Sequence, residues 1–240
     1  MLESKYYVKA QDAFAWLQDL DSDSVDLTVT DPAYESLEKW RATGTTTRLK
    51  HSTQSSNDWF PVIKNAQLPD LFAQLYRVQK MNTHCYFFCD PETAFIAVPM
   101  AKAAGFKFWK PLVWDKKKIG MGYHYRARYE FVLFFEKGKR RLNNMSTPDV
   151  LEVVRLKGKD VWPTEKPIAL CDVFIKQSSK PGELVIDPFM GSGAVGVAAT
   201  RAGRNFAGCD INPEAVTLTV RRIKGDQDRD AKQLMLPGIP

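Results

Sequence analysis

The tetrapeptide Asp31-Pro32-Ala33-Tyr34 closes the short apolar run 25–30, and its groups suit the methylation of an aromatic amino nitrogen. The lone pair of that nitrogen is delocalised into the ring, so two acceptors bound to its hydrogens would favour the tetrahedral form that can attack. Asp31 offers a carboxylate, the rigid backbone at Pro32 a carbonyl, and Tyr34 a face on which a base can stack. An ordinary Asp-Pro turn at a strand end uses the same residues, so both interpretations stay open at this point.

A second Asp-Pro pair, Asp187-Pro188, follows the apolar residues 184–186 and leads into a glycine-rich turn. This turn has the pattern Gly-x-Gly-x-x-Gly, and Asp210 lies nineteen residues after Gly191, where it could accept hydrogen bonds from ribose hydroxyls. A nicotinamide dinucleotide fits this pattern, and a tight strand–helix junction also needs glycines. We favour S-adenosylmethionine, because the Asp187 carboxylate would be unfavourable near a pyrophosphate but could receive a cationic ammonium group or its water shell.

Basic residues are concentrated in the second half of the chain, with 11 Lys/Arg and 3 Asp/Glu between Lys107 and Arg141. A basic stretch that also contains aromatic side chains suits a polyanion whose bases can stack, such as a nucleic acid. A solvated basic surface with interleaved core aromatic residues explains the pattern equally well. The aromatic residues of this stretch include Trp109, Trp114, Tyr123, Tyr125 and Tyr129.

The length of 240 residues fits one large domain, and the apolar fraction of 44% argues against wholesale disorder. No stretch reaches the roughly 18 apolar residues of a membrane span. Residues 1–5 lack a signal-peptide pattern, so we expect a cytoplasmic protein without membrane contact. The cysteines fit neither zinc spacing nor a disulfide framework, which indicates reduced, mostly buried thiols. They are Cys85, Cys89, Cys171 and Cys209.

Strand and helix patterns alternate along the chain, which predicts a mainly parallel sheet covered on both faces. Ligands of such sheets bind beyond the carboxyl ends of the strands, so the two Asp-Pro motifs could be neighbours there. We expect strands over 5–9, 25–30, 84–89, 106–115, 130–136, 184–186 and 205–209. We expect helices over 10–20, 68–80, from Pro91 onward, and over 168–177, 195–202 and 213–223.

Together, the two motifs resemble those of the beta class of amino-group DNA methyltransferases. In that class an Asp-Pro-Pro-Tyr motif precedes the cofactor motif Asp-Pro-Phe-x-Gly-Ser-Gly. Three further segments match the class in the same order: Gln11-Asp12, residues 114–138, and Pro163-Thr164-Glu165-Lys166-Pro167. The resemblance implies one α/β domain over 1–240. Its fold would be a Rossmann-like, S-adenosylmethionine-dependent methyltransferase with a seven-stranded, mainly parallel sheet and an antiparallel hairpin.

The resemblance also implies roles for individual residues. Asp31 and the Pro32 carbonyl would hold the target amino group, Ala33 would complete the catalytic turn, and Tyr34 would stack on the flipped base. The transfer would need no metal and no covalent enzyme intermediate. Because an aspartate in the first position usually accompanies adenine-N6 methylation and a serine cytosine-N4 methylation, we expect adenine. The implied cofactor residues are Asp12, Thr164, Glu165, Lys166, Asp187, Phe189, Gly191, Ser192, Gly193, Asp210 and Asn212.

Three positions depart from the pattern of the class. Ala33 replaces the second proline and removes a ring that stiffens the turn. Gln11 replaces a glycine, which weakens the role of Asp12, and Glu165 replaces a glutamine and adds a negative charge.

Double-stranded DNA is the expected partner, and the protein is expected to associate with the nucleoid. A mobile DNA-facing loop over 35–60 and a small target-recognition segment over 138–162 would contribute to recognition, which indicates a short or relaxed site. A homodimer stays open, because members of the class often pair. The residues expected to contact DNA are Arg41, Arg48, Lys116, Lys117, Lys118, Tyr125, Arg126 and Arg128.

Two other functions also stay open. The same enzyme could act on cytosine-N4 or on RNA. Alternatively, Ala33 could mark a catalytically weak, DNA-binding regulatory protein.

Overall fold

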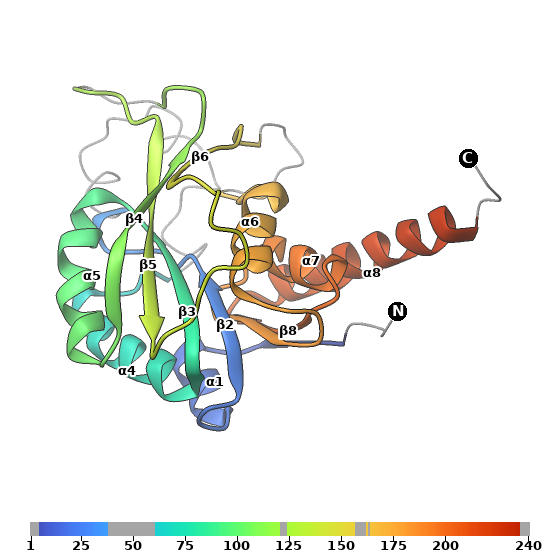
Figure 1. Cartoon of the computed structure of the whole chain (residues 1–240), viewed down its shortest axis with the longest axis horizontal. Coiled ribbons are helices and arrows are strands. Elements are labelled where there is room, and N and C mark those ends of the chain that lie inside the picture. Colours follow the sequence, from blue (N-terminus) through green and yellow to red (C-terminus); the bar gives the residue numbers. More distant parts are fainter. Residues whose placement is uncertain (1–4, 38–60, 121–123, 157–161, 163, 236–240) are drawn as a thin grey trace.

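Eight strands form one sheet in the computed structural model, which describes residues 5–37, 61–120, 124–156, 162 and 164–235 (Figure 1). Their order is β1-β8-β7-β2-β3-β5-β4-β6, and all neighbours run parallel except β5, which is antiparallel to β3 and β4. The strands are β1 (Tyr6–Ala10), β2 (Val25–Thr30), β3 (Gln79–Cys89), β4 (Lys107–Asp115), β5 (Tyr129–Lys137), β6 (Val150–Glu152), β7 (Leu184–Asp187) and β8 (Asn205–Asp210).

The mainly parallel sheet with an antiparallel hairpin was expected, but the expected count of seven strands was wrong. The additional strand is β6, which pairs with Val113–Asp115 of β4 at the sheet edge. Only Leu151 of its three residues is buried, and one buried side chain gives too little alternation to predict a strand. β6 lies within the segment 138–162 that we expected to recognise the target, so part of that segment belongs to the sheet.

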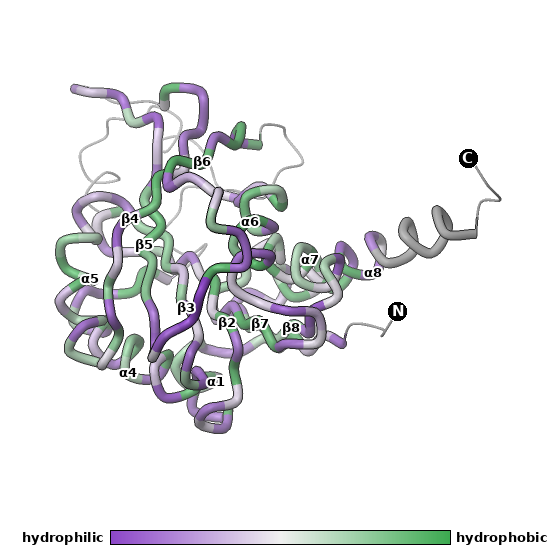
Figure 2. The backbone as a smooth tube through the Cα atoms, viewed as in Figure 1, coloured by the Kyte–Doolittle hydropathy of each residue, from purple (hydrophilic) through white to green (hydrophobic). Residues whose placement is uncertain are grey.

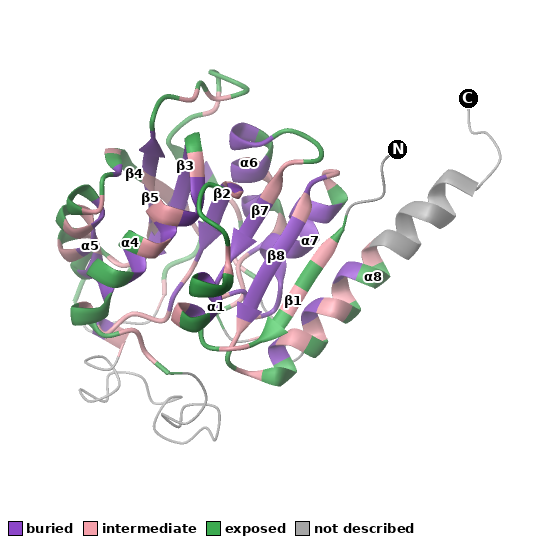
Figure 3. Cartoon of the chain, turned by 90° about the horizontal axis from the view of Figure 1, so that it is seen from below, coloured by how far each residue is buried: buried purple, intermediate pink, exposed green. Residues whose placement is uncertain are grey.

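Helices cover both faces of the sheet. On one face, buried side chains of α1, α4 and α5 pack together around residues such as Phe72 and Phe87; on the other, α6, α7 and α8 pack around Phe174 and Phe206. Hydrophobic stretches recur in the strands and helices of both layers (Figure 2), and most residues of β2, β7 and β8 are buried (Figure 3). The helices are α1 (Ala13–Asp19), α4 (Leu68–Val78), α5 (Pro91–Ala103), α6 (Ile168–Ser178), α7 (Ala194–Arg201) and α8 (Pro213–Met235), with a 3₁₀ turn η2 (Asn65–Gln67).

Two expected boundaries differ from those in the structure by five residues or more. α8 continues to Met235 instead of ending at 223. β3 begins at Gln79 rather than at His84, because the buried Gln79 amide donates to the Thr83 hydroxyl and the His84 carbonyl and so satisfies polar groups at the strand start.

The four cysteines are free and buried, as the sequence indicated. Within the described residues, no helix combines the length and the apolar character that a membrane span requires.

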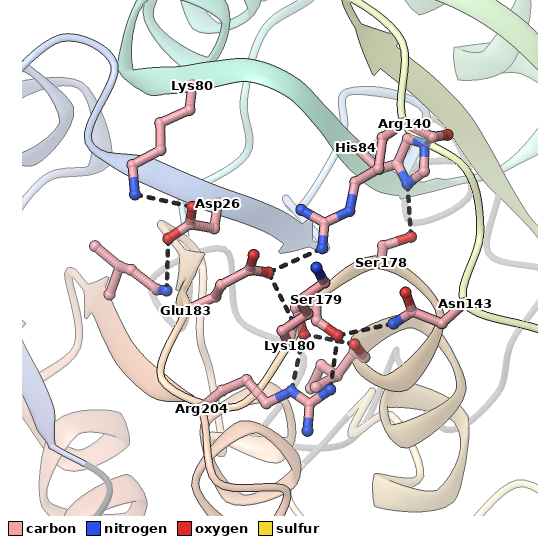
Figure 4. A network of polar contacts seen from close by, with 12 residues as sticks. Asp26, Lys80, His84, Arg140, Asn143, Ser178, Ser179, Lys180, Glu183 and Arg204 are labelled. Atoms are coloured by element: carbon pink, nitrogen blue, oxygen red, sulfur yellow. Dashed lines mark hydrogen bonds and ion pairs between the residues drawn. The ribbon is translucent and has the colours of Figure 1, made fainter.

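A polar network connects the amino-terminal ends of the central strands (Figure 4). The Asp-Pro motifs lie at the opposite, carboxyl-terminal ends of the strands. Asp26 on β2 accepts from Lys80 Nζ at 2.8 Å and from the Leu184 backbone nitrogen at 2.9 Å, which joins β2, β3 and β7. Arg204 Nη2 donates to the Ser179 carbonyl at 2.7 Å, and Arg204 is itself buried. These bonds hold the starts of the strands in register. The carboxyl-terminal ends of the strands, which take no part in the network, are available for binding.

His84 is the buried titratable group of this network. Its Nε2 must carry the hydrogen, because its partner at 3.1 Å is the Arg140 carbonyl, which only accepts. Nδ1 therefore accepts from the Ser178 hydroxyl at 2.7 Å, and that hydroxyl accepts in turn from Tyr86. Burial is the main cause that lowers the pKa of His84 to about 4.

The folded protein should lose stability in mild acid because of His84. Its folded pKa of about 4 lies below the unfolded value of about 6.5, so the unfolded chain takes up a proton first as the pH falls. The free energy of unfolding should drop by about 2 kcal/mol between pH 7.5 and pH 5 from this residue. Urea denaturation at both pH values should show that the free energy of unfolding drops less in His84→Gln than in the wild type. The control His124→Gln, at an exposed position, should show the same drop as the wild type. Equal drops in all three proteins would contradict the role of His84.

Candidate active site

A cavity of about 350 Å³ opens at the carboxyl ends of β2, β7 and β8. Fourteen of the residues predicted from the two motifs and the segments around them line it, so the fold unites parts of the chain that are distant in sequence. They are Asp12, Asp31, Pro32, Ala33, Tyr34, Thr164, Glu165, Lys166, Asp187, Phe189, Gly191, Ser192, Asp210 and Asn212.

The Asp-Pro turn, residues 31–34, follows β2 and is held by backbone bonds rather than by a second proline. The Ala33 carbonyl accepts from the Ile63 backbone nitrogen at 2.7 Å, and Tyr34 pairs with Ile63 in an isolated β-bridge. Just beyond it, Ser36 Oγ donates to Asp90 Oδ2 at 2.7 Å, which ties the turn to the end of β3. These bonds supply part of the stiffness that the missing proline ring would give.

Charged side chains surround Asp31. Lys166 Nζ forms a short ion pair with Asp31 Oδ2 and lies 3.4 Å from Glu130 Oε2. Lys116 Nζ lies 2.5 Å from the other oxygen of Glu130. Burial raises the pKa of Asp31 and outweighs the opposing effect of Lys166. Burial also acts to raise the pKa of Glu130, but Lys166 and Lys116 outweigh it and lower that pKa.

The glycine turn, residues 187–193, begins with a buried carboxylate. Asp187 Oδ1 accepts from Thr30 Oγ1 at 2.8 Å and from the Phe189 backbone nitrogen at 3.0 Å. Burial raises the pKa of Asp187 to about 7, although both of these bonds lower it. Thr30 is the last residue of β2, so this bond links the two motifs directly.

The glycines of this turn are required by its backbone. Gly191 has a φ of +48° and Gly193 a φ of +78°, which L-residues rarely adopt. A Cβ on Gly193 would lie 2.5 Å from Thr219 of α8, so Gly193 backs onto α8 and does not line the cavity. Thr219 Oγ1 also donates to the Gly191 carbonyl at 3.2 Å, which fixes the turn from behind.

Asp210 and Asp12 are the acidic residues that end β8 and begin α1. Asp210 accepts from the Gly191 and Asn212 backbone nitrogens, each at 2.9 Å and each on a different oxygen. Asp12 caps α1 by accepting from the backbone nitrogens of Phe14 and Ala15. Both carboxylates therefore position local backbone as well as face the cavity.

Glu165 is paired rather than exposed. Its Oε1 accepts from Arg222 Nη2 of α8 at 2.7 Å, while Arg222 Nη1 donates to the Ser192 carbonyl at 2.8 Å. Glu165 stands where the class has a glutamine, and Arg222 compensates its additional negative charge while also contacting the glycine turn.

The β4–β5 hairpin loop carries the predicted DNA-contact residues of the described chain. Lys117 pairs with Glu152 at 2.9 Å, and Arg128 makes two bonds to Asp115. Lys118, Tyr125 and Arg126 are exposed, and Tyr125 is fully so. Arg41, Arg48 and most of the loop 35–60 lie outside the described residues.

A model of the DNA methylase family, which comprises N6 and N4 methyltransferases, matches residues 25–221. The chain belongs to this N6/N4 DNA methylase family. DNA adenine methyltransferase YhdJ of Escherichia coli (strain K12) is 26% identical over 270 residues, which span 93% of this methylase and 84% of YhdJ. The resemblance inferred from the motifs is therefore confirmed.

Solved structures confirm the fold. The M1.HpyAVI–SAM complex superimposes with a TM-score of 0.65 at 23% identity and covers 90% of this methylase and 99% of that chain. The PvuII DNA methyltransferase, named cytosine-N4-specific, gives a TM-score of 0.67 at 15% identity and covers 94% and 91%.

Two residues of this methylase site escaped the sequence reasoning. Glu130 is one of only three acidic residues in the basic stretch, and that contrast was a usable signal. Arg222 lies among other charged residues on α8, and only the packing of α8 against the glycine turn shows its role.

The Glu165–Arg222 pair should show energetic coupling. Each single change, Glu165→Gln or Arg222→Met, leaves a poorly solvated partner, so the double variant should be more stable than the sum of the two effects by about 1–2 kcal/mol. Urea denaturation of the four proteins gives this coupling. Strictly additive changes in the free energy of unfolding would mean that Glu165 and Arg222 are not energetically coupled.

Proposed function

We propose that this methylase transfers a methyl group from S-adenosylmethionine to N6 of a flipped adenine in double-stranded DNA. The observation that carries the proposal is the bond between Thr30 and Asp187, which joins the Asp-Pro turn to the glycine turn on one cavity. One turn has groups for a target base and the other has groups for a nucleoside cofactor.

The donor set of the cavity fits S-adenosylmethionine. Each oxygen of Asp210 accepts one backbone bond and keeps a lone pair for a ribose hydroxyl. Both bonds to Asp187 reach Oδ1, which leaves Oδ2 for a cationic amine. The named complex of M1.HpyAVI with SAM supports this choice. The cofactor supplies an electrophilic methyl group bound to a positive sulfur.

The residues of the chain position the nucleophile for that methyl group. The Asp31 carboxylate and the Pro32 carbonyl accept the two hydrogens of the target amine and favour a tetrahedral nitrogen. Tyr34 stacks on the base and holds its ring. Alignment of two reactants in one cavity accounts for much of the rate, because it replaces a bimolecular encounter.

Adenine is favoured over cytosine by the aspartate in the first position of the Asp-Pro motif and by the likeness to YhdJ, a DNA adenine methyltransferase. Cytosine-N4 is the second candidate, because PvuII DNA methyltransferase shares the fold. Incubation of DNA with radiolabelled cofactor, followed by nucleoside analysis, separates the two: label in N6-methyladenine supports the proposal and label in N4-methylcytosine replaces it.

Replacement of Asp31 should separate binding from turnover. Asp31→Asn keeps the shape but provides a weaker acceptor, so turnover should fall at least about 100-fold, within the range of a lost transition-state contact. The affinity for S-adenosylhomocysteine, measured by calorimetry, should stay within about threefold. Wild-type rates of DNA methylation by Asp31→Asn and Asp31→Ala would refute the assigned role.

The exposed end of the hairpin should contribute to DNA affinity. Arg126→Ala should weaken DNA binding at every sequence and lower the slope of log K against log salt by about 1, because one phosphate contact is lost. Lys102→Ala in the last turn of α5 makes the same charge change and serves as the control, because α5 ends just before the start of β4, at the other end of the hairpin from residues 116–128. Fluorescence anisotropy at several salt concentrations measures both. Equal slopes for the two variants would exclude a phosphate contact by Arg126.

A further inference from the structure

Four charged side chains form a chain from the Asp-Pro turn to the base of the hairpin. Asp31 contacts Lys166, Lys166 contacts Glu130, and Glu130 contacts Lys116. The four come from the end of β2, the segment before α6, the start of β5 and the residue after β4. All are at most a quarter exposed, so solvent screens their interactions weakly.

Lys166 is the central member, and its position depends on more than Asp31. An ammonium group on a four-carbon stem has many rotamers and must be held to present a fixed charge. Its other neighbours are Glu130 Oε2 at 3.4 Å, the Thr164 carbonyl at 3.4 Å and the ring of Phe88 at 5.2 Å, and of these only Glu130 carries a charge. Lys116 Nζ in turn lies 2.5 Å from Glu130 Oε1 and holds that carboxylate in place. The chain therefore contains two carboxylates and two ammonium groups.

We propose that Glu130 is a positioning residue for methyl transfer. It holds the Lys166 ammonium, and Lys166 holds Oδ2 of Asp31, so that Oδ1 is kept for the hydrogen of the target amine. This role rests on the proposed function, because it presumes that Asp31 binds the target. It does not depend on whether the base is adenine or cytosine.

The pKa values of the two carboxylates are shifted in opposite directions, which agrees with this division. Glu130 stays ionised beside two lysines, whereas burial keeps the pKa of Asp31 above its ordinary value. The negative charge of Glu130 contributes to that raised pKa. The groups that interact with Asp31 are Lys166, Glu130, Lys116, Tyr34, Cys89, Cys171 and Asp187.

Glu130→Gln tests the role by turnover. Loss of the anchor should lower kcat about 10–100-fold, as expected for a misplaced catalytic group, with S-adenosylhomocysteine affinity within about twofold of wild type. The acid limb of the kcat profile should move to lower pH, since Glu130 no longer raises the pKa of Asp31. Glu130→Asp keeps the negative charge, so the acid limb of its kcat profile should stay at the pH seen for the wild type. Asp149→Asn, which removes the partner of Lys110 on the outer edge of the sheet, should change neither quantity.

Nuclear magnetic resonance of the lysine ammonium groups gives a readout that needs no turnover. The Lys166 signal, identified by its absence in Lys166→Met, should be visible in the wild type and lost or shifted in Glu130→Gln but not in Asp149→Asn. An unchanged Lys166 signal, or unchanged kcat, in Glu130→Gln would overturn the inference. Failure of the unmodified protein to transfer label to DNA would instead count against the proposed function, and the Lys166 signal would still decide the contact.

Discussion

The parallel pairing of β2 with β7 is the constraint on which the rest of the structure depends. Thr28 lies beside Ile186 in this pairing. The bond from Thr30 to Asp187, the last residues of the two strands, extends the pairing and joins residues 157 positions apart in the sequence. A shift in this register would move the Asp-Pro turn, proposed to bind the target base, away from the glycine turn, proposed to bind the nucleoside of the cofactor. The polar network at the opposite edge, centred on Asp26 and Arg204, fixes the same register from the other end.

Charge balance is the second condition that the site must meet. Isolated charges are costly where water is scarce, and two groups of charged residues around the cavity have partners of the opposite sign, whereas Asp187 and Asp210 accept hydrogen bonds from neutral donors. Lys166 lies between two carboxylates, and Glu165 is paired with Arg222. Several basic residues in the second half of the chain are therefore paired with carboxylates of the same molecule. Fewer of its lysines and arginines are free for DNA than a count of charges indicates.

The sequence predicted the parts of the fold that local pattern and short-range chemistry determine. The ends of β2 and β7 followed from apolar runs closed by Asp-Pro, and the glycine turn followed from backbone conformations that glycine adopts far more readily than other residues. β6 was missed because its three residues form a strand only beside β4. The contacts of Glu130 and Arg222 were missed for a similar reason, because each depends on how distant elements pack. The acidic Glu130 stands out in the basic stretch, but that contrast does not identify its partners.

The bond between Ala33 and Ile63 has a consequence for how this enzyme could diversify. It joins a residue before the segment 38–60 to one after it at the rim of the cavity, so the described residues on the two sides of that segment lie next to each other. Residues could be inserted or removed between these ends at little cost to the sheet, because loop closure depends only weakly on length. Substrate preference could then change through that segment while the methyl-transfer chemistry stays the same.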